Sequence, residues 1–328
     1  MKAYTKKHKE EMKMKKTTKF LLGGSLVILF LTPVSQVKAD WHQDNVGWWY
    51  SLNDGSYYKN TEAKINEKWY KFDDRGYMMT GWQLIWERND SNYGIIKNWS
   101  YFDPVNGDKK LGWQNIDGKW YYLTKDGALM GDQNIDGKKY YFDPVNGDMK
   151  TGWRSEQQNS NTIWNYFDPE SGAKVEGWKN IDGKWYYFPK YYHAVTGFWS
   201  IDGKDYYFDP INCDMQTGWV SKQYHYGTEK LYFDPVSGAK VEGWQEIDGK
   251  KYYFGWNGAL RNHRKIDGKD YYFDPDTCEL KIGWFEALGN KYYADPNDGG
   301  ALASNKTLII DGISYTFDYN CILINNAP

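Results

Sequence analysis

One aromatic phrase recurs along the chain, and it limits the fold more than any other feature. Residues 140–153 read YYFDPVNGDMKTGW, and close relatives such as YFDPVNGDKKLGW, YFDPINCDMQTGW and YFDPVSGAKVEGW occur before and after it. About thirteen copies of the unit I-D-G-K-x-Y-Y-F-D-P-x-x-G-x-x-x-x-G-W, some degenerate, fill residues 47–328. The DGK phrases repeat every 19 or 20 residues at their closest, which leaves no room for a useful helix between turns.

Each unit reads as a β-hairpin. The K-x-Y-Y-F segment alternates in polarity, D-P-x-x-G or K-D-G supplies a turn, and a short second strand ends at Gly-Trp. A single two-stranded hairpin is only marginally stable in water, so each must bury its ring-bearing face against the next. We therefore expect an all-β solenoid, a superhelical stack of about thirteen short β-hairpins in one repeat array.

A longer period is superimposed on the short one. Trp113, Trp178 and Trp244 are 65 and 66 residues apart, which indicates a duplicated block of three hairpins. Each block contains one long segment that we expect to be a connector: Gln83–Asn98, Arg154–Asn165 and Val220–Lys230.

The amino terminus has the pattern of a secretory signal peptide. A lysine-rich stretch precedes an apolar run from Phe20 to Leu31, and Val37-Lys38-Ala39 resembles a cleavage site. The apolar run is too short to span a bilayer. The expected organisation is a signal peptide at residues 1–39 and a secreted repeat array at residues 40–328.

Charge excludes several partners. Removing the leader takes away nine lysines and two glutamates, which leaves 32 basic and 41 acidic residues and a net charge near −9. Such a surface repels nucleic acid and anionic membranes and favours cationic ligands. Aromatic residues make up 19% of the chain, so the apolar surface comes mainly as half-buried rings with polar handles.

Catalytic and metal-binding patterns are weak. Cys213, Cys278 and Cys321 occupy the slot of a turn glycine in their repeats, and the histidines lack repeat-fixed carboxylate or cysteine partners. The DPVNGD phrase lacks the ligand spacing and closing glutamate of an EF-hand. We therefore expect no enzyme, no metal and no cofactor.

Alternation along the strands brings rings together. In K-W-Y-Y-F, Trp120 shares a face with Tyr122, and Trp185 shares a face with Tyr187. A Gly-Trp tryptophan lies seven residues earlier, so each junction between hairpins should gather two tryptophans and a tyrosine of the next hairpin. Such a pocket suits a quaternary ammonium ion, at about 0.5–2 kcal/mol per well-placed ring, and stacking on sugar rings is the rival use.

The phrases IDGKWYYL, TGW and GALASN resemble the choline-binding, or cell-wall-binding, repeats of Gram-positive surface proteins and lysins. The resemblance covers essentially the whole chain after the leader, and it implies that the secreted protein is located at the bacterial cell wall or cell surface. It implies a left-handed superhelix in which choline of teichoic or lipoteichoic acid sits between hairpins, held by two tryptophans and a tyrosine. The best sites it implies combine Trp113, Trp120 and Tyr141, or Trp178, Trp185 and Tyr207. Looser matches pair Trp82 with Trp99 and Trp153 with Trp164, and Tyr122 and Tyr187 complete the nearby walls.

Several repeats depart from this pattern. Lysine or aspartate replaces the strand tryptophan at Lys139, Asp205, Lys230, Lys251, Asp270 and Lys291. The later sites then consist of Trp219 with Tyr232, Trp244 with Tyr253, and Trp284 with Tyr293. KKYYF repeats also resemble glucan-binding and clostridial toxin repeats, so binding of a glucan or host glycan stays open. An adhesin that uses the long segments is a third possibility, and competition with other wall proteins for the same polymer is a further expectation.

Overall fold

The computed structural model describes residues 38–158, 161–225 and 227–327. Residues 1–37, which hold most of the expected signal peptide, lie outside the described part. The chain divides into two compact units, one ending at Gly81 and including Phe102–Lys109, the other made of Trp82–Tyr101 and the chain from Lys110 onward. The expected single array from residue 40 to residue 328 stays a prediction.

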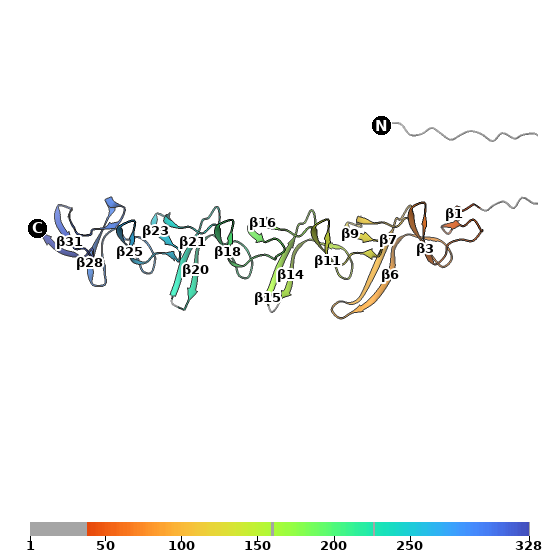
Figure 1. Ribbon diagram of the computed structural model, residues 1–328, viewed down its shortest axis with the longest axis horizontal. Helices are drawn as coiled ribbons and strands as arrows, with labels where there is room; N and C mark the ends of the chain where they lie inside the picture. The colour runs from red at the N-terminus through yellow and green to blue at the C-terminus, as the bar shows by residue number, and fades with distance from the viewer. Residues whose placement is uncertain (1–37, 159–160, 226, 328) are drawn as a thin grey trace, which may run out of the picture. The chain divides into compact units, whose positions relative to one another are not determined.

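The fold is all-β, as predicted. The described residues form thirteen small antiparallel sheets and one short 3₁₀ helix, η1 (Pro296–Asp298). Figure 1 shows the hairpins of the second unit following one another in chain order. The left-handed superhelix stays a prediction.

Seven sheets are two-stranded hairpins. They are β1 (Asp40–Gln43) with β2 (Trp48–Ser51), β6 (Gly81–Asp90) with β7 (Gly94–Phe102), β14 (Gly152–Gln158) with β15 (Asn161–Phe167), β16 (Gly177–Ile181) with β17 (Lys184–Phe188), β18 (Gly197–Ile201) with β19 (Lys204–Phe208), β20 (Gly218–Tyr224) with β21 (Gly227–Phe233), and β25 (Asn262–Ile266) with β26 (Lys269–Phe273).

Six sheets add a short third strand to the hairpin. They are β3 (Thr61–Ile65), β4 (Lys68–Phe72) and β5 (Met78–Met79); β8 (Gly112–Ile116), β9 (Lys119–Thr124) and β10 (Gly127–Ala128); β11 (Gly131–Ile135), β12 (Lys138–Phe142) and β13 (Met149–Lys150); β22 (Gly243–Ile247), β23 (Lys250–Gly255) and β24 (Gly258–Ala259); β27 (Gly283–Ala287), β28 (Asn290–Asp295) and β29 (Ala301–Leu302); and β30 (Lys306–Ile310), β31 (Ile313–Phe317) and β32 (Leu323–Ala327).

The expected position of the hairpin turn is wrong. Gly-Trp opens the first strand of a hairpin, and the turn is the Asp-Gly pair, as at Asp117 (φ 52°) and Gly118 (φ 78°). Two central residues with positive φ make a tight turn whose twist matches that of the strands. The turn therefore supports a five-pair ladder from Gly112↔Leu123 to Ile116↔Lys119. The D-P-x-x-G loop instead leads to the next hairpin and pairs few residues, for example Phe142 with Met149.

The segments expected to be connectors also lie inside hairpins. The described residues of Gln83–Asn98, Arg154–Asn165 and Val220–Lys230 form the outer parts of β6–β7, β14–β15 and β20–β21. These hairpins are longer than their neighbours and project as arms (Figure 1). Once per block, therefore, the ladder is extended.

Burial follows the strand alternation. In β12 and β17 the first tyrosine and the phenylalanine are buried, whereas the residue before that tyrosine, Lys139 or Trp185, is exposed. The predicted packing role of the phenylalanines is confirmed, because five of them are fully enclosed: Phe102, Phe142, Phe208, Phe233 and Phe273. Their burial fixes one face of each hairpin against a neighbour and leaves the other face to build sites.

The three cysteines occupy strained turn positions, as their alignment with glycine predicts. Cys213, Cys278 and Cys321 have φ of 64°, 68° and 68°, and all three are buried and reduced. Burial raises the pKa of the Cys213 thiol to about 11, so it is neutral and packs as a small apolar group. Among the described residues, no helix is long and apolar enough to cross a membrane.

Candidate functional site: aromatic cages between hairpins

Hairpin register places each Gly-Trp tryptophan opposite a tyrosine. Trp113 pairs with Tyr122 across β8 and β9, and their ring centroids are 5.2 Å apart. Trp120 lies on the same face of the hairpin, 6.5 Å from Trp113 at an interplanar angle of 79°. These contacts confirm the predicted gathering of Trp113, Trp120 and Tyr122.

The next hairpin closes the cluster with its first tyrosine. The ring of Tyr140 lies 4.9 Å from that of Trp113, at 63°. The ring of Phe142 also packs against Trp113, with a distance of 5.8 Å between the ring centroids. Two perpendicular tryptophans and a tyrosine edge thus form a three-ring wall, which we call an aromatic cage.

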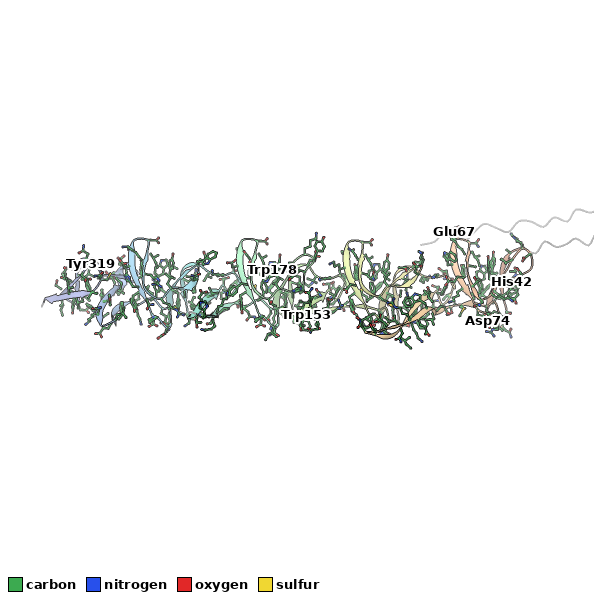
Figure 2. The ribbon with its side chains drawn as sticks, turned by 60° about the horizontal axis from the view of Figure 1, so that its bottom comes forward. His42, Glu67, Asp74, Trp153, Trp178 and Tyr319 are labelled. Atoms are coloured by element: carbon green, nitrogen blue, oxygen red, sulfur yellow. The ribbon has the colours of Figure 1, made fainter. Side chains whose placement is uncertain are left out.

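The same cage recurs at two later positions of the second unit. Trp178 has Trp185 at 6.4 Å and 81° and Tyr206 at 4.9 Å. Trp153, labelled with Trp178 in Figure 2, has Trp164 at 6.2 Å and 89° and Tyr186 at 4.8 Å. Trp153 and Trp164, given above as a loose match, therefore form a full cage. Trp153 pairs with Tyr166 and Trp164 pairs with Ser155, so the two tryptophans lie on the same face of the β14–β15 hairpin.

The predicted third rings Tyr141 and Tyr207 are wrong for these cages. Tyr141 packs near Phe167, and Tyr207 lies 4.6 Å from Phe198. The reason is that a hairpin meets its predecessor with the face that carries the first tyrosine. The second tyrosine of each hairpin pairs instead with the Gly-Trp position of the same hairpin. Tyr140 and Tyr206 are therefore the third rings of the cages, in place of Tyr141 and Tyr207.

Two of the cages that contain a pair of tryptophans open into distinct cavities. Trp82, Trp99 and Tyr121 line one of about 350 Å³, with Lys119 at its rim. In the first unit, Trp41, Trp48 and Tyr70 line one of about 390 Å³. This first-unit cage was missed because its repeat, DWHQDNVGWWYS, lacks the Asp-Gly and Tyr-Tyr-Phe landmarks. The usable signal was a pair of tryptophans seven residues apart, the spacing of Trp113 and Trp120.

The two tryptophans of a cage differ in exposure. Trp120 and Trp185 remain 44% and 45% exposed. Trp113 and Trp178 are only partly exposed and pack against the buried clusters around Phe142 and Phe208. The strand tryptophan is therefore mainly a binding surface, whereas the Gly-Trp tryptophan both packs and binds.

Lysines at the cage rims are neutralised by carboxylates. Lys119 lies 3.9 Å from Asp148, and Lys184 lies 3.0 Å from Asp214. Both aspartates are buried, and in the described part of the chain one oxygen of each has no hydrogen-bond partner. The local field at the cages therefore does not repel a cation.

The three carboxy-terminal cages contain one tryptophan each, as predicted. Trp219, Trp244 and Trp284 keep their tyrosines: Tyr232 and Tyr252, Tyr253 and Tyr271, and Tyr293 and Tyr315, all at centroid distances of 4.7–5.2 Å.

Lysines stand in for the missing tryptophans, each in a different way. Lys291 places its ammonium 4.9 Å from the ring centroid of Trp284. Lys251 and Glu246 line the cavity of about 430 Å³ at Trp244. Lys230 instead donates to the carbonyl of Asp276 at 2.7 Å.

Every third hairpin of the second unit lacks the Gly-Trp tryptophan. Asp132, Phe198 and His263 occupy its position opposite Tyr141, Tyr207 and Tyr272. At the first two junctions a cation of the chain lies on the rings. The Arg154 guanidinium is 3.6 Å from the Tyr141 centroid, and the Lys222 ammonium is 4.4 Å from that of Phe198.

The third such junction brings a histidine to a carboxylate. His263 Nε2 lies 3.2 Å from Asp270 Oδ1, and the Cys321 sulfur is within 4.8 Å of both groups. The expectation that the histidines lack such partners is therefore wrong for His263. Burial raises the pKa of Cys321, and Lys265 also approaches Asp270, so the Asp270 carboxylate lies between a histidine and a lysine beside a packed thiol.

Two family models match the chain. A "Choline-binding repeat" model matches residues 129–176 and 195–242. A "Putative cell wall binding repeat" model matches residues 112–129, 176–190, 242–260 and 264–276. The matched ranges include the cages at Trp113, Trp153, Trp178, Trp219 and Trp244.

Individual relatives fall into two groups. The solved structure of CbpJ from Streptococcus pneumoniae TIGR4 is similar over 87% of this chain and all of its own, with 26% identity and a TM-score of 0.51. Glucosyltransferase-S of Streptococcus mutans is 28% identical over 262 residues, which is 74% of this chain and 15% of the relative. Glucosyltransferase-S of Streptococcus downei is 28% identical over 166 residues, 48% of this chain and 11% of the relative. The chain thus spans less than a fifth of these curated relatives.

Proposed function

We propose that this chain, whose repeats match the models of a choline-binding repeat and a putative cell wall binding repeat, attaches to a bacterial cell wall by holding choline groups of teichoic or lipoteichoic acid in its aromatic cages. The repeats are binding modules, and no catalytic step is assigned to them. Secretion by the amino-terminal leader is part of the proposal, as is competition with other wall proteins for the same polymer.

The observation that carries the proposal is the cage geometry. Rings of Trp113, Trp120 and Tyr140 meet at 63–79°, which leaves ring faces on several sides of one small space. A trimethylammonium group has no hydrogen-bond donor, so ring faces are its best partners, at about 0.5–2 kcal/mol per ring. Several cages on one polymer raise avidity by about 10²–10⁴ without any new contact.

The chain's own cations support the choice of a cationic ligand. Where the Gly-Trp tryptophan is missing, Arg154 lies on Tyr141, and where the strand tryptophan is missing, Lys291 lies on Trp284. Ring clusters at equivalent positions therefore attract positive charge within the same molecule.

Retention on a tertiary-amine resin tests the proposal. The full chain should bind the resin and elute with free choline at millimolar concentration. The variants Trp120→Ala and Trp185→Ala should elute at lower choline, whereas Trp256→Ala should behave like the parent. Trp256 is a suitable control because it is 82% exposed and outside the cages. Passage through the resin without retention would refute choline binding.

A second candidate is binding of a glucan or host glycan, which the likeness to glucosyltransferase-S supports. Tryptophan and tyrosine faces in the cages also stack on pyranose rings. Retention on a dextran column that free choline does not reverse would establish this function, and an adhesin role would appear as partner binding lost when the β14–β15 arm is shortened.

A further inference from the structure

The junction that follows β11–β12 differs from every cage around it. Its Gly-Trp position holds Asp132, its strand-tryptophan position holds Lys139, and the next hairpin offers Asn165 where the cages have a tyrosine. In place of three rings there is a cavity of about 560 Å³ lined mainly by polar and charged side chains. The junction has therefore exchanged an aromatic wall for a polar one.

Two lysines converge on this cavity. The backbone N–H of Lys174 donates to the carbonyl of Lys139 at 2.7 Å, which holds the loop after β15 against β12. Both side chains line the cavity, and neither ammonium forms an ion pair with any carboxylate that the structure describes. Lys174 is about half-buried, and burial, followed by the charge of Lys139, lowers its pKa.

The pairing of two lysines is specific to this junction. The same backbone hydrogen bond joins a loop residue to a strand residue at five other junctions: Lys109 with Trp69, Ala194 with Trp164, Met215 with Trp185, Lys240 with Asp205, and Leu280 with Lys251. None of those five pairs carries two positive charges. Two like charges that line one cavity repel each other, and the charge of Lys139 lowers the pKa of Lys174, so the Lys139–Lys174 pair favours a counter-ion.

The acidic residues of the cavity do not supply that counter-ion. Asp132 and Glu156 both bind the guanidinium of Arg154, at 3.1 Å in the case of Asp132. Glu176 is a further acidic residue that acts on Lys174, and it does not line the cavity. His193 adds a further group near Lys174, and burial lowers its pKa, so it is neutral and able to donate one hydrogen bond.

Other groups around the cavity also suit a polar ligand. Asn165 is 6% exposed, and its Oδ1 has no hydrogen-bond partner among the described residues. Tyr191 is 69% exposed and stands beside Lys139, whose ammonium lies 5.3 Å from the ring centroid. The cavity thus presents two ammonium groups, an imidazole and an exposed phenol side chain around one space.

We propose that Lys139 and Lys174 form an oxyanion site that takes a phosphate group of the wall polymer. Lysine ammoniums bind phosphate as point charges with charge-assisted hydrogen bonds, which are about twice as strong as neutral ones. The identity of the polymer rests on the function proposed above, whereas the oxyanion site itself does not. A polymer with choline cations and phosphate anions would then meet cages at Trp113 and Trp153 and an anion site at the junction between them.

Equilibrium dialysis of the full chain against inorganic phosphate, and separately against poly(glycerol phosphate), tests the site. The double variant Lys139→Gln/Lys174→Gln should bind both probes at least about tenfold more weakly, since each charged hydrogen bond lost costs about that much or more. The matched control Lys125→Gln/Lys265→Gln removes the same charge from exposed positions outside the cavity and should bind like the parent. Lys174→Arg should retain binding, and added salt should weaken it.

Choline dialysis of the same proteins separates this site from the cages. The double variant should keep the parent's choline binding, and its thermal midpoint should not fall, because the two lysine charges repel each other in the parent. If the double variant and the control bind phosphate equally, or if the parent binds neither anionic probe, the oxyanion site is refuted while choline binding stands. Binding of inorganic phosphate without poly(glycerol phosphate) would refute the polymer as its source. If the double variant loses retention on dextran but binds phosphate like the parent, the cavity binds a neutral sugar and the proposal is overturned.

Discussion

The cages from Trp82 to Trp185 and those from Trp219 to Trp284 share a scaffold but differ in one strand position. Both sets keep the Gly-Trp tryptophan between two tyrosines at about the same distances, for example 5.1 and 4.9 Å at Trp178 and 5.2 and 5.0 Å at Trp244. The first set adds a strand tryptophan, whereas the second has Lys230, Lys251 or Lys291. Packing therefore depends on the Gly-Trp tryptophan, and ligand affinity can change at the strand position without disturbing the fold.

The largest expected effect separates packing from binding within one cage. Trp178→Ala removes the ring that contacts Tyr187, Tyr206 and Phe208, and should destabilise the fold by about 3 kcal/mol. Trp185→Ala removes a ring that is 45% exposed and should cost below about 1 kcal/mol. Both variants should lose one choline site, as equilibrium dialysis measures. Equal shifts in thermal midpoint for the two variants would contradict this division of roles.

A smaller effect is expected when a carboxy-terminal cage is converted into the amino-terminal type. Lys291→Trp replaces an ammonium that lies on Trp284 with a ring beside it. One added ring should strengthen that site by about 2- to 30-fold, the equivalent of about 0.5–2 kcal/mol. Lys291→Met removes the charge without adding a ring and serves as the control. Stoichiometry of bound choline at a fixed low concentration is the measurement, and no gain over Lys291→Met would show that the strand position does not decide affinity.

The smallest expected effect is common to both regions. Asp168 and Asp274 accept hydrogen bonds from loop N–H groups and from Lys179 and Lys281, which hold the pKa of each carboxyl well below its usual value of 3.8. A carboxyl whose pKa is depressed by folding stabilises the protein above pH 3.8, and this stability is lost as the pH falls below that value. The thermal midpoint should therefore fall between pH 5 and pH 2.

Asparagine variants check that the acid effect is shared. Asp168→Asn and Asp274→Asn should each lower the midpoint at pH 7 by about 1–2 °C, because ion pairs near the surface contribute little. In thermal melts followed by tryptophan fluorescence, the midpoint of both variants should also fall less between pH 5 and pH 2 than that of the parent. A loss confined to one variant would indicate that the two regions differ in more than their rings.

Much of the fold could be predicted because the repeats constrain it so strongly. A unit of 19 or 20 residues with two turn signals allows little besides a hairpin, and the described residues form thirteen sheets. The turn itself was assigned to the wrong signal, since D-P-x-x-G and I-D-G-K both read as turns. Only the pair of positive φ angles at Asp117 and Gly118 shows which of them closes the ladder.

The candidate sites were predictable only within a hairpin. Spacing placed Trp113 with Trp120 and Tyr122, because all three belong to one ladder. No local sequence pattern shows which face a hairpin turns toward the hairpin before it. The sequence therefore led to Tyr141 as the third ring, whereas Tyr140 contacts Trp113. The oxyanion site had no signal of its own, because Lys139 and Lys174 lie 35 residues apart and meet only through a loop hydrogen bond.

The most direct test compares choline with 3,3-dimethylbutan-1-ol, which has the same shape but no charge. Isothermal titration of the full chain with each compound separates attraction to a cation from simple burial of methyl groups. We predict saturable choline binding in the millimolar range or tighter and binding of the alcohol that is at least about tenfold weaker, since two or three rings act on the charge. Equal affinity for the two compounds, or no saturable choline binding, would contradict the assignment of the aromatic cages as quaternary ammonium sites.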